Sequence, residues 1–428
     1  MNARAFVLGG GVAGITAAFR LNERGFAVTL FESHRGLGGR AFSRHDERIG
    51  DEIDNGPHVV LGCYDAFRAL LRRLGTEGDF VRQDTLTLRY RESGGHTSEL
   101  RLPPWSPKLG LAWSALRFSR MGIGARLRLL RGAVCATLRG RKVETLETWL
   151  VRHRQHAGPR RFLWDPLCRA IFNAPPSAVS ARLFLGTLMR ALGRGRAGAA
   201  IWFPRAGWSK LLGEPAEQGL ARAGVAVRVG AEVARLESSA AKVGAIVLRS
   251  GERIVVSDAD LVVSALPWHV LPKVLTGSNP AETPHVPGAA ITTVHFAGID
   301  LPDEGPLLCL VDGEPFHFLC RRPGAANDRF ALLASGDFAG STRSGDAEAK
   351  AREQLARYFP GCKVTAGRAR VIRMANATAL FGPADAQRRV LPGRHPRLTN
   401  LWICGDATAT GLPTTLEGAA VSALAILP

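Results

Sequence analysis

The amino-terminal part of the chain combines short apolar runs with a stretch of helical spacing. Ala5 to Leu8 is a continuous apolar run of the kind that forms a buried strand, and the glycine-rich segment Gly9 to Gly14 follows it. Gly25 marks the end of a predicted helix, and Ala27 to Phe31 is a second apolar run. Within the predicted helix, apolar residues recur on one face at Ile15, Ala18, Phe19 and Leu21. The pattern predicts a βαβ unit and therefore an α/β fold.

Later parts of the chain carry further strand patterns. Val225 to Leu236 and Ala245 to Val256 alternate in polarity, which predicts two antiparallel strands with Gly251 in a turn between them. Leu261 to Leu266 and Leu401 to Cys404 are apolar runs that predict two more buried strands. Strand patterns are thus separated by long stretches of other sequence.

Length and composition place the chain among folded proteins of more than one domain. A chain of 428 residues exceeds what one hydrophobic core usually supports, and 46% hydrophobic with 22% charged residues is a globular composition. The seven cysteines form no C-x-x-C pair, which predicts neither a disulfide framework nor a metal site. No run reaches the ~18 apolar residues that a spanning helix needs. Met1 to Leu8 contains no signal-peptide segment, so we expect a cytoplasmic protein.

The chain is strongly basic, and the basic residues interleave with apolar ones in one region. Lys and Arg total 56 against 37 Asp and Glu, which attracts an anionic membrane, nucleic acid or only counterions. Residues 101–143 contain no acid, and neither do residues 166–213. The basic residues of the first stretch are Arg101, Lys108, Arg117, Arg120, Arg126, Arg128, Arg131, Arg139, Arg141 and Lys142. Its aromatic and leucine residues include Trp105, Leu109, Leu111, Trp113, Leu116, Phe118 and Leu127.

This combination is typical of helices that lie on an anionic lipid surface. We therefore expect a peripheral protein on the inner face of the cytoplasmic membrane. A solvated basic helix is the alternative interpretation. No nucleic-acid recognition motif accompanies the basic residues, so nucleic acid is not an expected partner.

The glycine-rich segment fits a dinucleotide site. Gly9, Gly11 and Gly14 form G-x-G-x-x-G between the predicted strand and helix, where they allow a tight turn, a close approach to pyrophosphate and close helix packing. The first helix amides then face the phosphates. Glu32 ends the second strand, where an acid binds ribose hydroxyls and disfavours a 2′-phosphate.

The next segment indicates which dinucleotide is bound. Glu32 to Arg40, with Gly38-Gly39-Arg40 at its end, resembles the E-x-x-x-x-x-G-G-R segment of amine oxidases, carotenoid desaturases and their relatives. The resemblance implies FAD in a Rossmann-type, glutathione reductase-like domain. Together the motif and the resemblance give the first expected FAD contacts: Gly9, Gly11, Val12, Ala13, Gly14, Glu32, Ser33, Arg35, Gly38, Gly39 and Arg40.

A second segment near the carboxyl end is similar to the one that closes the flavin site in this family. Gly405-Asp406 and the stretch Gly411 to Ala419 carry the similarity. It implies that Gly405 and Asp406 contact the ribityl or phosphate part of FAD, and that amides of Thr415 and Leu416 face the isoalloxazine. By the same resemblance, Val233 contacts the adenine.

The resemblance also implies how the chain divides into domains. Residues 1–100, 216–269 and 392–428 are expected to build the FAD-binding domain. Residues 101–215 and 270–391 are expected to form an α+β substrate domain with a membrane-facing helical part.

Smaller matches concern the substrate. Asp54-Asn55-Gly56-Pro57-His58 is similar to the D-N-G-Q-H segment of hydroxysqualene dehydroxylases, and Asn173 to Pro176 is similar to their L-N-T-P-P stretch. Trp164 to Cys168 and Phe203 to Trp208 extend the similarity, while Pro57 stands where Gln is expected and Ala174 where Thr is expected. The resemblance implies replacement of the allylic hydroxyl of hydroxysqualene by hydride from reduced FAD, in bacterial squalene and hopanoid biosynthesis.

The same segment supplies the candidate catalytic residues. His58 and Asp54 are the candidate donors to the leaving hydroxyl, with packing roles as the alternative, and Gly56, Pro57 and His58 are further expected FAD contacts. His295 and His317 are expected to line the substrate cavity. No second dinucleotide motif identifies the electron donor, so direct reduction by NADPH would need an unrecognised site, and a separate reductase is the alternative.

Four other functions stay open. A carotenoid-type desaturase would run the flavin chemistry in the opposite direction. An amine oxidase is disfavoured because Tyr64, Tyr90 and Tyr358 are the only tyrosines and none lies near Gly405-Asp406 to form an aromatic cage. A noncatalytic flavin- and lipid-binding protein and a basic nucleic-acid binder that stores a flavin are the remaining alternatives.

Overall fold

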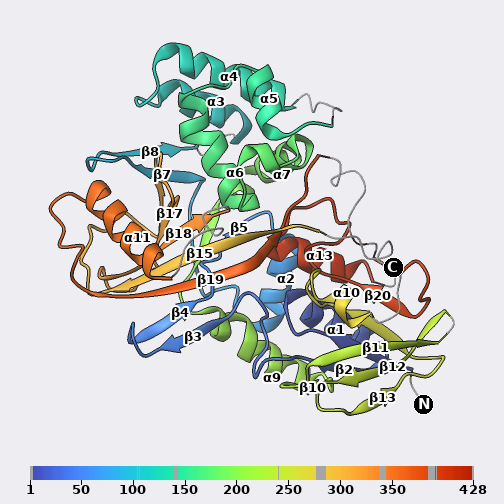
Figure 1. Cartoon of the computed structure of the whole chain (residues 1–428). Helices are drawn as coiled ribbons and strands as arrows, with labels where there is room; N and C mark the ends of the chain where they lie inside the picture. The colour runs from blue at the N-terminus through green and yellow to red at the C-terminus, as the bar shows by residue number, and fades with distance from the viewer. Residues whose placement is uncertain are drawn as a thin grey trace.

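The protein is built around two large sheets (Figure 1). The computed structural model describes residues 3–426 except 104, 106, 138–142, 240, 276–285, 337–343, 384–390 and 392. One sheet is parallel and five-stranded, and the other is mixed and seven-stranded. Helices cover both, so the predicted α/β class is confirmed.

The parallel sheet has the strand order β10-β2-β1-β14-β20. Its strands are β10 (Ala226–Arg228), β2 (Ala27–Phe31), β1 (Arg4–Leu8), β14 (Leu261–Ser264) and β20 (Leu401–Ile403). Leu8 lies opposite Phe31 on one side and Ser264 on the other. Strands covered on both faces are apolar along their length, which explains the continuous apolar runs in the sequence.

Each face of the parallel sheet packs against its own layer. On one face lie α1 (Val12–Glu23), α2 (Asp65–Leu74), α9 (Glu214–Arg222) and α13 (Leu416–Leu424). On the other lie α10 (Leu271–Val274) and an antiparallel sheet of β11 (Val233–Ser239), β12 (Lys242–Leu248) and β13 (Arg253–Val255). The two termini lie near this half of the molecule (Figure 1).

The prediction of a single strand from Val225 to Leu236 is wrong. Gly230 adopts a left-handed backbone with φ of +67°, which turns the chain between β10 and β11. The first half then joins the parallel sheet beside β2, and the second half pairs with β12. Gly251 lies in the turn between β12 and β13 and not between the two predicted strands.

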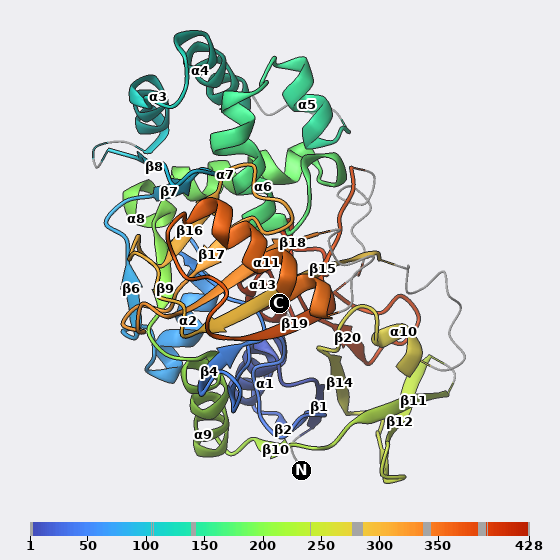
Figure 2. The same cartoon turned by 60° about the vertical axis from the view of Figure 1, so that its left-hand side comes forward.

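The seven-stranded sheet has the order β19-β15-β18-β17-β16-β7-β8. Its strands are β19 (Arg368–Ala379), β15 (Gly288–Ala297), β18 (Arg329–Ser335), β17 (Phe318–Cys320), β16 (Leu307–Leu310), β7 (Thr87–Arg91) and β8 (Thr97–Arg101). Only the β16–β7 pair is parallel among these strands. α11 (Ser344–Tyr358) packs on one face (Figure 2). Strands from residues 1–100 thus contribute to both sheets, and the division into domains stays a prediction.

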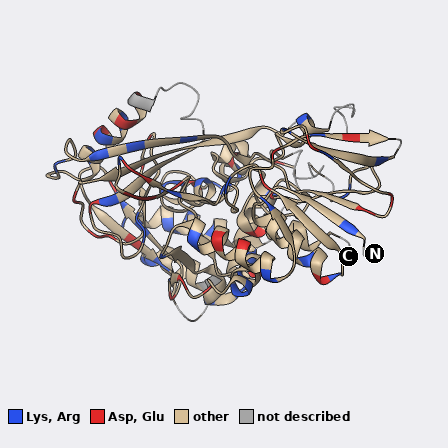
Figure 3. Cartoon of the chain, turned by 90° about the horizontal axis from the view of Figure 1, so that it is seen from below, with Lys and Arg blue, Asp and Glu red and all other residues tan. Residues whose placement is uncertain are grey.

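A group of helices, here called the cap helices, covers the other face of the seven-stranded sheet (Figure 1). They are α3 (Pro107–Arg117), α4 (Ile123–Thr137), α5 (Leu146–Arg152), α6 (Asp165–Phe172), α7 (Ala181–Gly193) and α8 (Gly195–Ala199). Within the described parts of the chain, no helix is long and apolar enough to cross a membrane. Lys and Arg residues are spread over strands and helices of the fold (Figure 3).

Two small sheets complete the fold. The hairpin of β3 (Ser43–Asp46) and β4 (Asp51–Asp54) packs through Ile49 and Ile53 onto Ala297 of the seven-stranded sheet. The other small sheet joins β5 (Val60–Leu61), β9 (Ile201–Pro204) and β6 (Phe80–Arg82). The loop from β4 to β5 carries the residues Asn55 to Val59, so these packing contacts decide where that loop lies.

Candidate active site

The amino end of α1 has the geometry of an anion-binding turn. Gly9 has φ of +103°, and a side chain on Gly14 would place its Cβ only 1.8 Å from the Gly9 carbonyl oxygen, so both positions require glycine. Gly11 is the N-cap residue and provides no side-chain cap. The first amides of α1, including those of Val12 and Ala13, have no acceptor within the helix and are available to an anion.

Glu32 connects this turn to the neighbouring segments. Its buried Oε2 accepts a hydrogen bond from the Gly10 amide at 2.7 Å, and its Oε1 accepts from the His34 amide at 2.8 Å and from the Ser33 hydroxyl at 3.0 Å. Its carbonyl accepts from the Ala231 amide at 2.8 Å, which places the start of β11, with Val233, beside Glu32. A carboxylate oxygen can accept more than one hydrogen bond, so Glu32 keeps capacity for ribose hydroxyls.

Arg40 joins the amino-terminal motif to the carboxyl-terminal one. Its Nη2 lies 2.5 Å from Asp406 Oδ1, its Nη1 donates to the Ala377 carbonyl at 2.7 Å, and its guanidinium lies 5.2 Å from the Trp268 ring centroid. Residues 366 positions apart in the sequence are therefore paired at one place. Gly38 donates to the Gly10 carbonyl at 2.9 Å, which holds the same loop against the turn.

The side chain of Arg35, one of the expected FAD contacts, is not fixed by the surrounding structure. The Arg35 side chain extends into solvent from the loop after β2. Among the residues that the structure describes, Arg35 has no ion-pair partner, so it contributes charge near the turn without anchoring the fold.

The amino end of α13 supplies a second set of helix amides. Thr415 is the N-cap, and its hydroxyl accepts from the Gly418 amide at 3.1 Å. Thr414 donates to the Ala379 carbonyl at 3.0 Å, which fixes the segment against β19. The amide of Leu416 belongs to the unpaired first turn and can donate to an anionic edge of a ligand.

Glu417 fixes α13 to its neighbours although its side chain is almost fully buried. Its Oε2 accepts from the Phe67 amide at the start of α2 at 3.0 Å, and its Oε1 lies 3.2 Å from Arg190 Nη2 on α7. Burial raises the pKa of this carboxyl, which the Phe67 amide and Arg190 oppose. Glu417 thus ties a cap helix to the helix layer of the parallel sheet.

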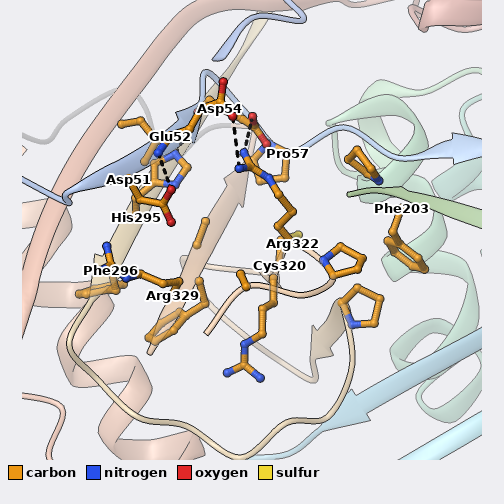
Figure 4. Close-up of a pocket in the computed structure, with 18 of the residues that line it drawn as sticks. Asp51, Glu52, Asp54, Pro57, Phe203, His295, Phe296, Cys320, Arg322 and Arg329 are labelled. Atoms are coloured by element: carbon orange, nitrogen blue, oxygen red, sulfur yellow. Dashed lines mark hydrogen bonds and ion pairs between the residues drawn. The ribbon is translucent and has the colours of Figure 1, made fainter. Parts of the chain in front are cut away.

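A cavity opens beside the loop that follows β4 (Figure 4). Both candidate catalytic residues, Asp54 and His58, line it together with Pro57. Its other lining residues come mostly from β9, the strands β15, β17 and β18 and the loop after β17; they include Phe203, His295, Phe296, Cys320, Arg322 and Arg329. The cavity therefore lies where the loop meets the seven-stranded sheet.

Asp54 is held by a partly buried network of hydrogen bonds. Its carboxylate accepts from the Ser43 hydroxyl and from Arg322 Nη2, the latter at 3.0 Å, and Ser43 in turn accepts from the Trp208 amide at 2.6 Å. Arg322 Nη1 also lies 3.6 Å from Glu52. Burial raises the pKa of Asp54, and the charge of Arg322 opposes that rise. Asp54 thus retains its proton to a higher pH than an ordinary aspartate.

His58 differs from Asp54 in its surroundings. Its ring packs edge-on against Trp208, with the ring centroids 5.8 Å apart. The charged side chains of Arg40 and Asp406 lie close enough to affect the pKa of His58. Burial, and secondly the charge of Arg40, lower the pKa of His58 to about 4. His58 is therefore a neutral imidazole at pH 7, which can donate and accept hydrogen bonds but lacks the second proton of an imidazolium.

The two other histidines named from the sequence have different surroundings. His295 lines the cavity and contacts the Asp54 carbonyl at 2.9 Å, as expected of a cavity residue. Burial lowers the pKa of His295 to about 4. His317 instead accepts from the Ser335 amide at 3.0 Å and lies 3.3 Å from Glu314, and it is absent from the lining of this cavity.

Sequence reasoning missed Glu52, Arg322 and Trp208 as parts of this site. Arg322 follows β17 and lies 268 positions from Asp54, so no local motif connects them. A weak signal existed for Trp208, which ends one of the segments similar to hydroxysqualene dehydroxylases. The remaining expected residue, Gly56, is buried within the loop between Asp54 and His58.

The residues present fit FAD. The amino end of α1 has no side-chain cap, and that of α13 has one, from Thr415. Their free backbone amides can bind the phosphates and the anionic edge of a flavin, and the buried Glu32 provides an acceptor for ribose. A Cβ added at Gly405 or Gly56 would meet no atom within 4 Å, so space exists beside both loops. These observations do not test the individual FAD contacts, which stay predictions.

Comparison with known proteins gives a consistent result. The family model of flavin containing amine oxidoreductases matches residues 12–425. Hydroxysqualene dehydroxylase of Rhodopseudomonas palustris is 30% identical over 98% of this chain and 96% of that protein. Hydroxysqualene dehydroxylase of Sinorhizobium fredii is 28% identical over 96% of this chain and 94% of that protein. A crystal structure of an oxidoreductase from Methanosarcina mazei has a TM-score of 0.74 at 15% identity, covering 99% of both chains, which concerns the fold alone.

Proposed function

The chain belongs to the flavin containing amine oxidoreductase family and is an FAD-dependent oxidoreductase, and from this premise we propose that it converts hydroxysqualene to squalene and water. The observation that carries the proposal is the similarity to two proteins named hydroxysqualene dehydroxylase over nearly the full length of each. An isoprenoid alcohol is then the substrate, in bacterial squalene and hopanoid biosynthesis. A reductase or another electron donor supplies the electrons.

The proposed FAD site uses the two helix starts. Val12 and Ala13 amides, with Gly9, Gly11 and Gly14 around them, would hold the pyrophosphate, while Glu32 and Val233 would hold the adenosine part. Ser33, Arg35, Gly38, Gly39, Arg40, Gly405, Asp406, Thr415, Leu416 and the loop residues Gly56, Pro57 and His58 complete the proposed contacts. Bound FAD, when reduced, supplies the hydride for the reaction.

The protein's own part in the proposed reaction is to bind, orient and protonate. Asp54 is the proposed proton source for the leaving hydroxyl, because burial raises its pKa. His58 is neutral at pH 7 and would offer a hydrogen bond from the same cavity. Apolar lining from Phe203, Phe296 and their neighbours would limit access of water to an allylic cation.

The alternative is an isoprenoid desaturase of the carotenoid type. Zeta-carotene desaturase of Solanum lycopersicum is 35% identical, but over only 24% of this chain and 18% of that protein. Zeta-carotene-forming phytoene desaturase of Myxococcus xanthus is 30% identical over 62% of this chain and 54% of that protein. Both matches cover less of the chain than the matches to hydroxysqualene dehydroxylases, which favours the dehydroxylase. Amine oxidation and noncatalytic flavin or lipid binding have no specific observation in their favour.

Two half-reactions separate the alternatives. Photoreduced enzyme mixed anaerobically with hydroxysqualene in detergent is expected to reoxidise its flavin and form squalene. Oxidised enzyme mixed with squalene or a longer polyene is expected to keep its flavin spectrum. Bleaching of the oxidised enzyme by a polyene, with no reaction of the reduced enzyme, would identify a desaturase instead.

We also propose that α3 and α4 contact an anionic membrane surface on the cytoplasmic side. Ile123 is 74% exposed and Trp105 is 60% exposed, and Trp113, Leu116 and Leu127 are exposed on the same two helices or beside them. Leu111 and Phe118 are buried in the core and do not take part. Arg139, Arg141 and Lys142, and the side chains of Lys108 and Leu109, lie outside the described residues.

Vesicle binding tests this surface. Each basic residue near an anionic leaflet contributes about 1 kcal/mol, and apolar residues add burial energy. Replacing Ile123 and Leu127 by Ser is expected to release the protein from anionic vesicles at moderate salt. Unchanged binding would show that these helices do not contact the lipid.

A further inference from the structure

A second cavity lies between the amino end of α4 and the start of α6, and it shares no lining residue with the cavity beside Asp54. Its volume is about 660 Å³, within the range of about 300–1,000 Å³ that is usual for ligand sites. Part of its lining is a π-helix, η1 (Arg160–Trp164), a rare element that often occurs at functional sites. Ala157, which also lines it, has a left-handed backbone with φ of +44°, and such strained residues cluster at ligand sites. The cavity therefore has features of a binding site separate from the candidate active site.

The charges around this cavity are unevenly distributed. Three of its arginines are paired with acids that lie outside α3 and α4; the pairs are Arg120–Glu92, Arg160–Glu147, Arg160–Asp165, Arg161–Glu92 and Arg161–Asp312. Arg128 also lines the cavity, and among the residues that the structure describes it has no ion-pair partner. Its Nη1 lies 3.6 Å from the place that a Cβ on Gly124 would take, so its guanidinium lies beside the first turn of α4. Because residues 101–143 contain no acid, the α4 side of the cavity attracts an anion.

The same helix carries two apolar stripes, of which only one is buried. Ala125, Leu129, Gly132 and Ala136 are buried against the protein, whereas Ile123, Leu127 and Val134 form a second stripe that is exposed. Ile123 belongs to the exposed stripe and also lines the cavity, so the two features adjoin. α4 lies at the end of the molecule far from the parallel sheet (Figures 1 and 2). An exposed apolar stripe beside an anion-attracting cavity is the arrangement that suits an amphipathic, negatively charged ligand.

We propose that this cavity binds the phosphate of an anionic phospholipid while the exposed stripe of α4 contacts the acyl chains. The inference deepens the membrane contact proposed above and rests on it, but it does not depend on the proposed reaction. The guanidinium of Arg128 supplies the positive charge without an acidic partner, and its planar donors match the oxygens of a phosphate. Arg120 donates to Glu92 only through Nε, so its Nη groups can make a second contact with the phosphate.

The test compares two variants of α4 in the FAD-loaded protein, with vesicles of mixed phosphatidylglycerol and phosphatidylcholine. Arg128→Gln removes the proposed phosphate contact. Arg131→Gln is the matched control, because Arg131 is an exposed arginine of the same helix that lines neither cavity. We expect vesicle affinity to fall by about 10- to 100-fold in Arg128→Gln, as for a hydrogen bond between charged groups, and by at most about 5-fold in Arg131→Gln. Equal losses would show that only the charge of the helix matters and would overturn the inference.

A soluble ligand tests the cavity without a membrane. Short-chain phosphatidylglycerol, below the concentration at which it forms micelles, is expected to bind to wild type and Arg131→Gln in calorimetry, and not to Arg128→Gln. Inorganic phosphate that binds as tightly, and equally through Arg128, would identify a site for free phosphate and overturn the lipid assignment. Should Arg128→Gln fail to fold or to retain FAD, Arg128→Lys and Arg131→Lys replace the pair, because lysine keeps the charge and loses the planar fork. The larger loss is again expected at position 128.

The two proposals fail in different ways. If replacing Ile123 and Leu127 by Ser releases the protein from vesicles but the two arginine variants lose affinity equally, the membrane contact stands and the cavity has no headgroup. If wild type ignores vesicles yet binds soluble phosphatidylglycerol through Arg128, the headgroup site stands and the membrane contact fails. Neither assay uses hydroxysqualene, so failure of the proposed reaction changes neither result.

Discussion

Replacing Arg322 by Leu should destabilise the protein through the carboxylates that Arg322 neutralises. The side chains of Arg322, Glu52 and Asp54 are 20%, 19% and 12% exposed, so water replaces the lost charge only in part. When Asp54 is ionised, its bond from Arg322 at 3.0 Å is a hydrogen bond between charged groups, for which about 1.5–3 kcal/mol is typical. The longer contact to Glu52 at 3.6 Å adds up to about 1 kcal/mol. Together these contacts predict a loss of roughly 1.5–4 kcal/mol, lower than the ~3–5 kcal/mol for breaking fully buried pairs because these side chains are partly exposed.

The pH dependence of this loss has a defined sign. Burial already raises the pKa of Asp54 in the folded protein, and removal of Arg322 raises it further. A carboxyl whose folded pKa lies above its unfolded value binds more protons in the folded state, so its penalty appears as the pH rises through the folded pKa. The difference in stability between wild type and Arg322→Leu should therefore be smaller at pH 5 than at pH 8.

Thermal or urea unfolding of the FAD-loaded protein between pH 5 and pH 8 measures both effects. Arg249→Leu is the matched control, because Arg249 pairs with Glu232 on the surface, where water screens the charges and such a pair contributes little to stability. Asp54→Asn combined with Arg322→Leu should recover part of the loss. A stability of Arg322→Leu equal to that of the control, or a deficit that grows as the pH falls, would refute the reasoning.

Three other predictions concern the flavin segments and His58. Gly14→Ala should abolish FAD retention, because the new Cβ would lie 1.8 Å from the Gly9 carbonyl oxygen. The control Gly186→Ala in α7 would meet no atom within 4 Å and should retain FAD. Flavin absorbance after gel filtration compares the two variants. Glu417→Ala should lower the unfolding free energy by about 1–3 kcal/mol, because the Phe67 amide loses its acceptor, and an unchanged urea midpoint would contradict this. Because the pKa of His58 is about 4, wild type and His58→Gln should share the same pH profile of single-turnover rates between pH 6 and pH 8, and an ionisation near pH 6.5 that disappears in the variant would disprove a neutral His58.

The sequence predicts the nucleotide-binding half of the fold well because its signals are local. The strand Ala27–Phe31 is found with the predicted bounds, since strands buried on both faces carry continuous apolar runs. The prediction of one strand from Val225 to Leu236 failed because the alternation of polar and apolar residues is the same in an edge strand of a parallel sheet and in an antiparallel hairpin. Only the backbone of Gly230 separates the two, and a glycine by itself does not specify φ.

The residues of the candidate site likewise fall into those found in local motifs and those brought together only by tertiary packing. Arg40 and Asp406 lie in glycine-rich motifs that the sequence displays, and the structure brings them together as an ion pair. The pairing of Arg322 with Asp54 depends on packing between the seven-stranded sheet and the loop after β4. No spacing in the sequence encodes such contacts, so tertiary structure was needed to find them.

Transfer of hydrogen from the flavin to the carbon that loses its hydroxyl is the central claim, and a single turnover in D₂O tests it most directly. Enzyme photoreduced in D₂O carries deuterium on the exchangeable flavin nitrogen, and it would be mixed anaerobically with hydroxysqualene. The account predicts squalene that contains one deuterium atom, formed in equal amount to the flavin that is reoxidised. Unchanged hydroxysqualene with the flavin still reduced, or a polyene product without deuterium, would contradict it.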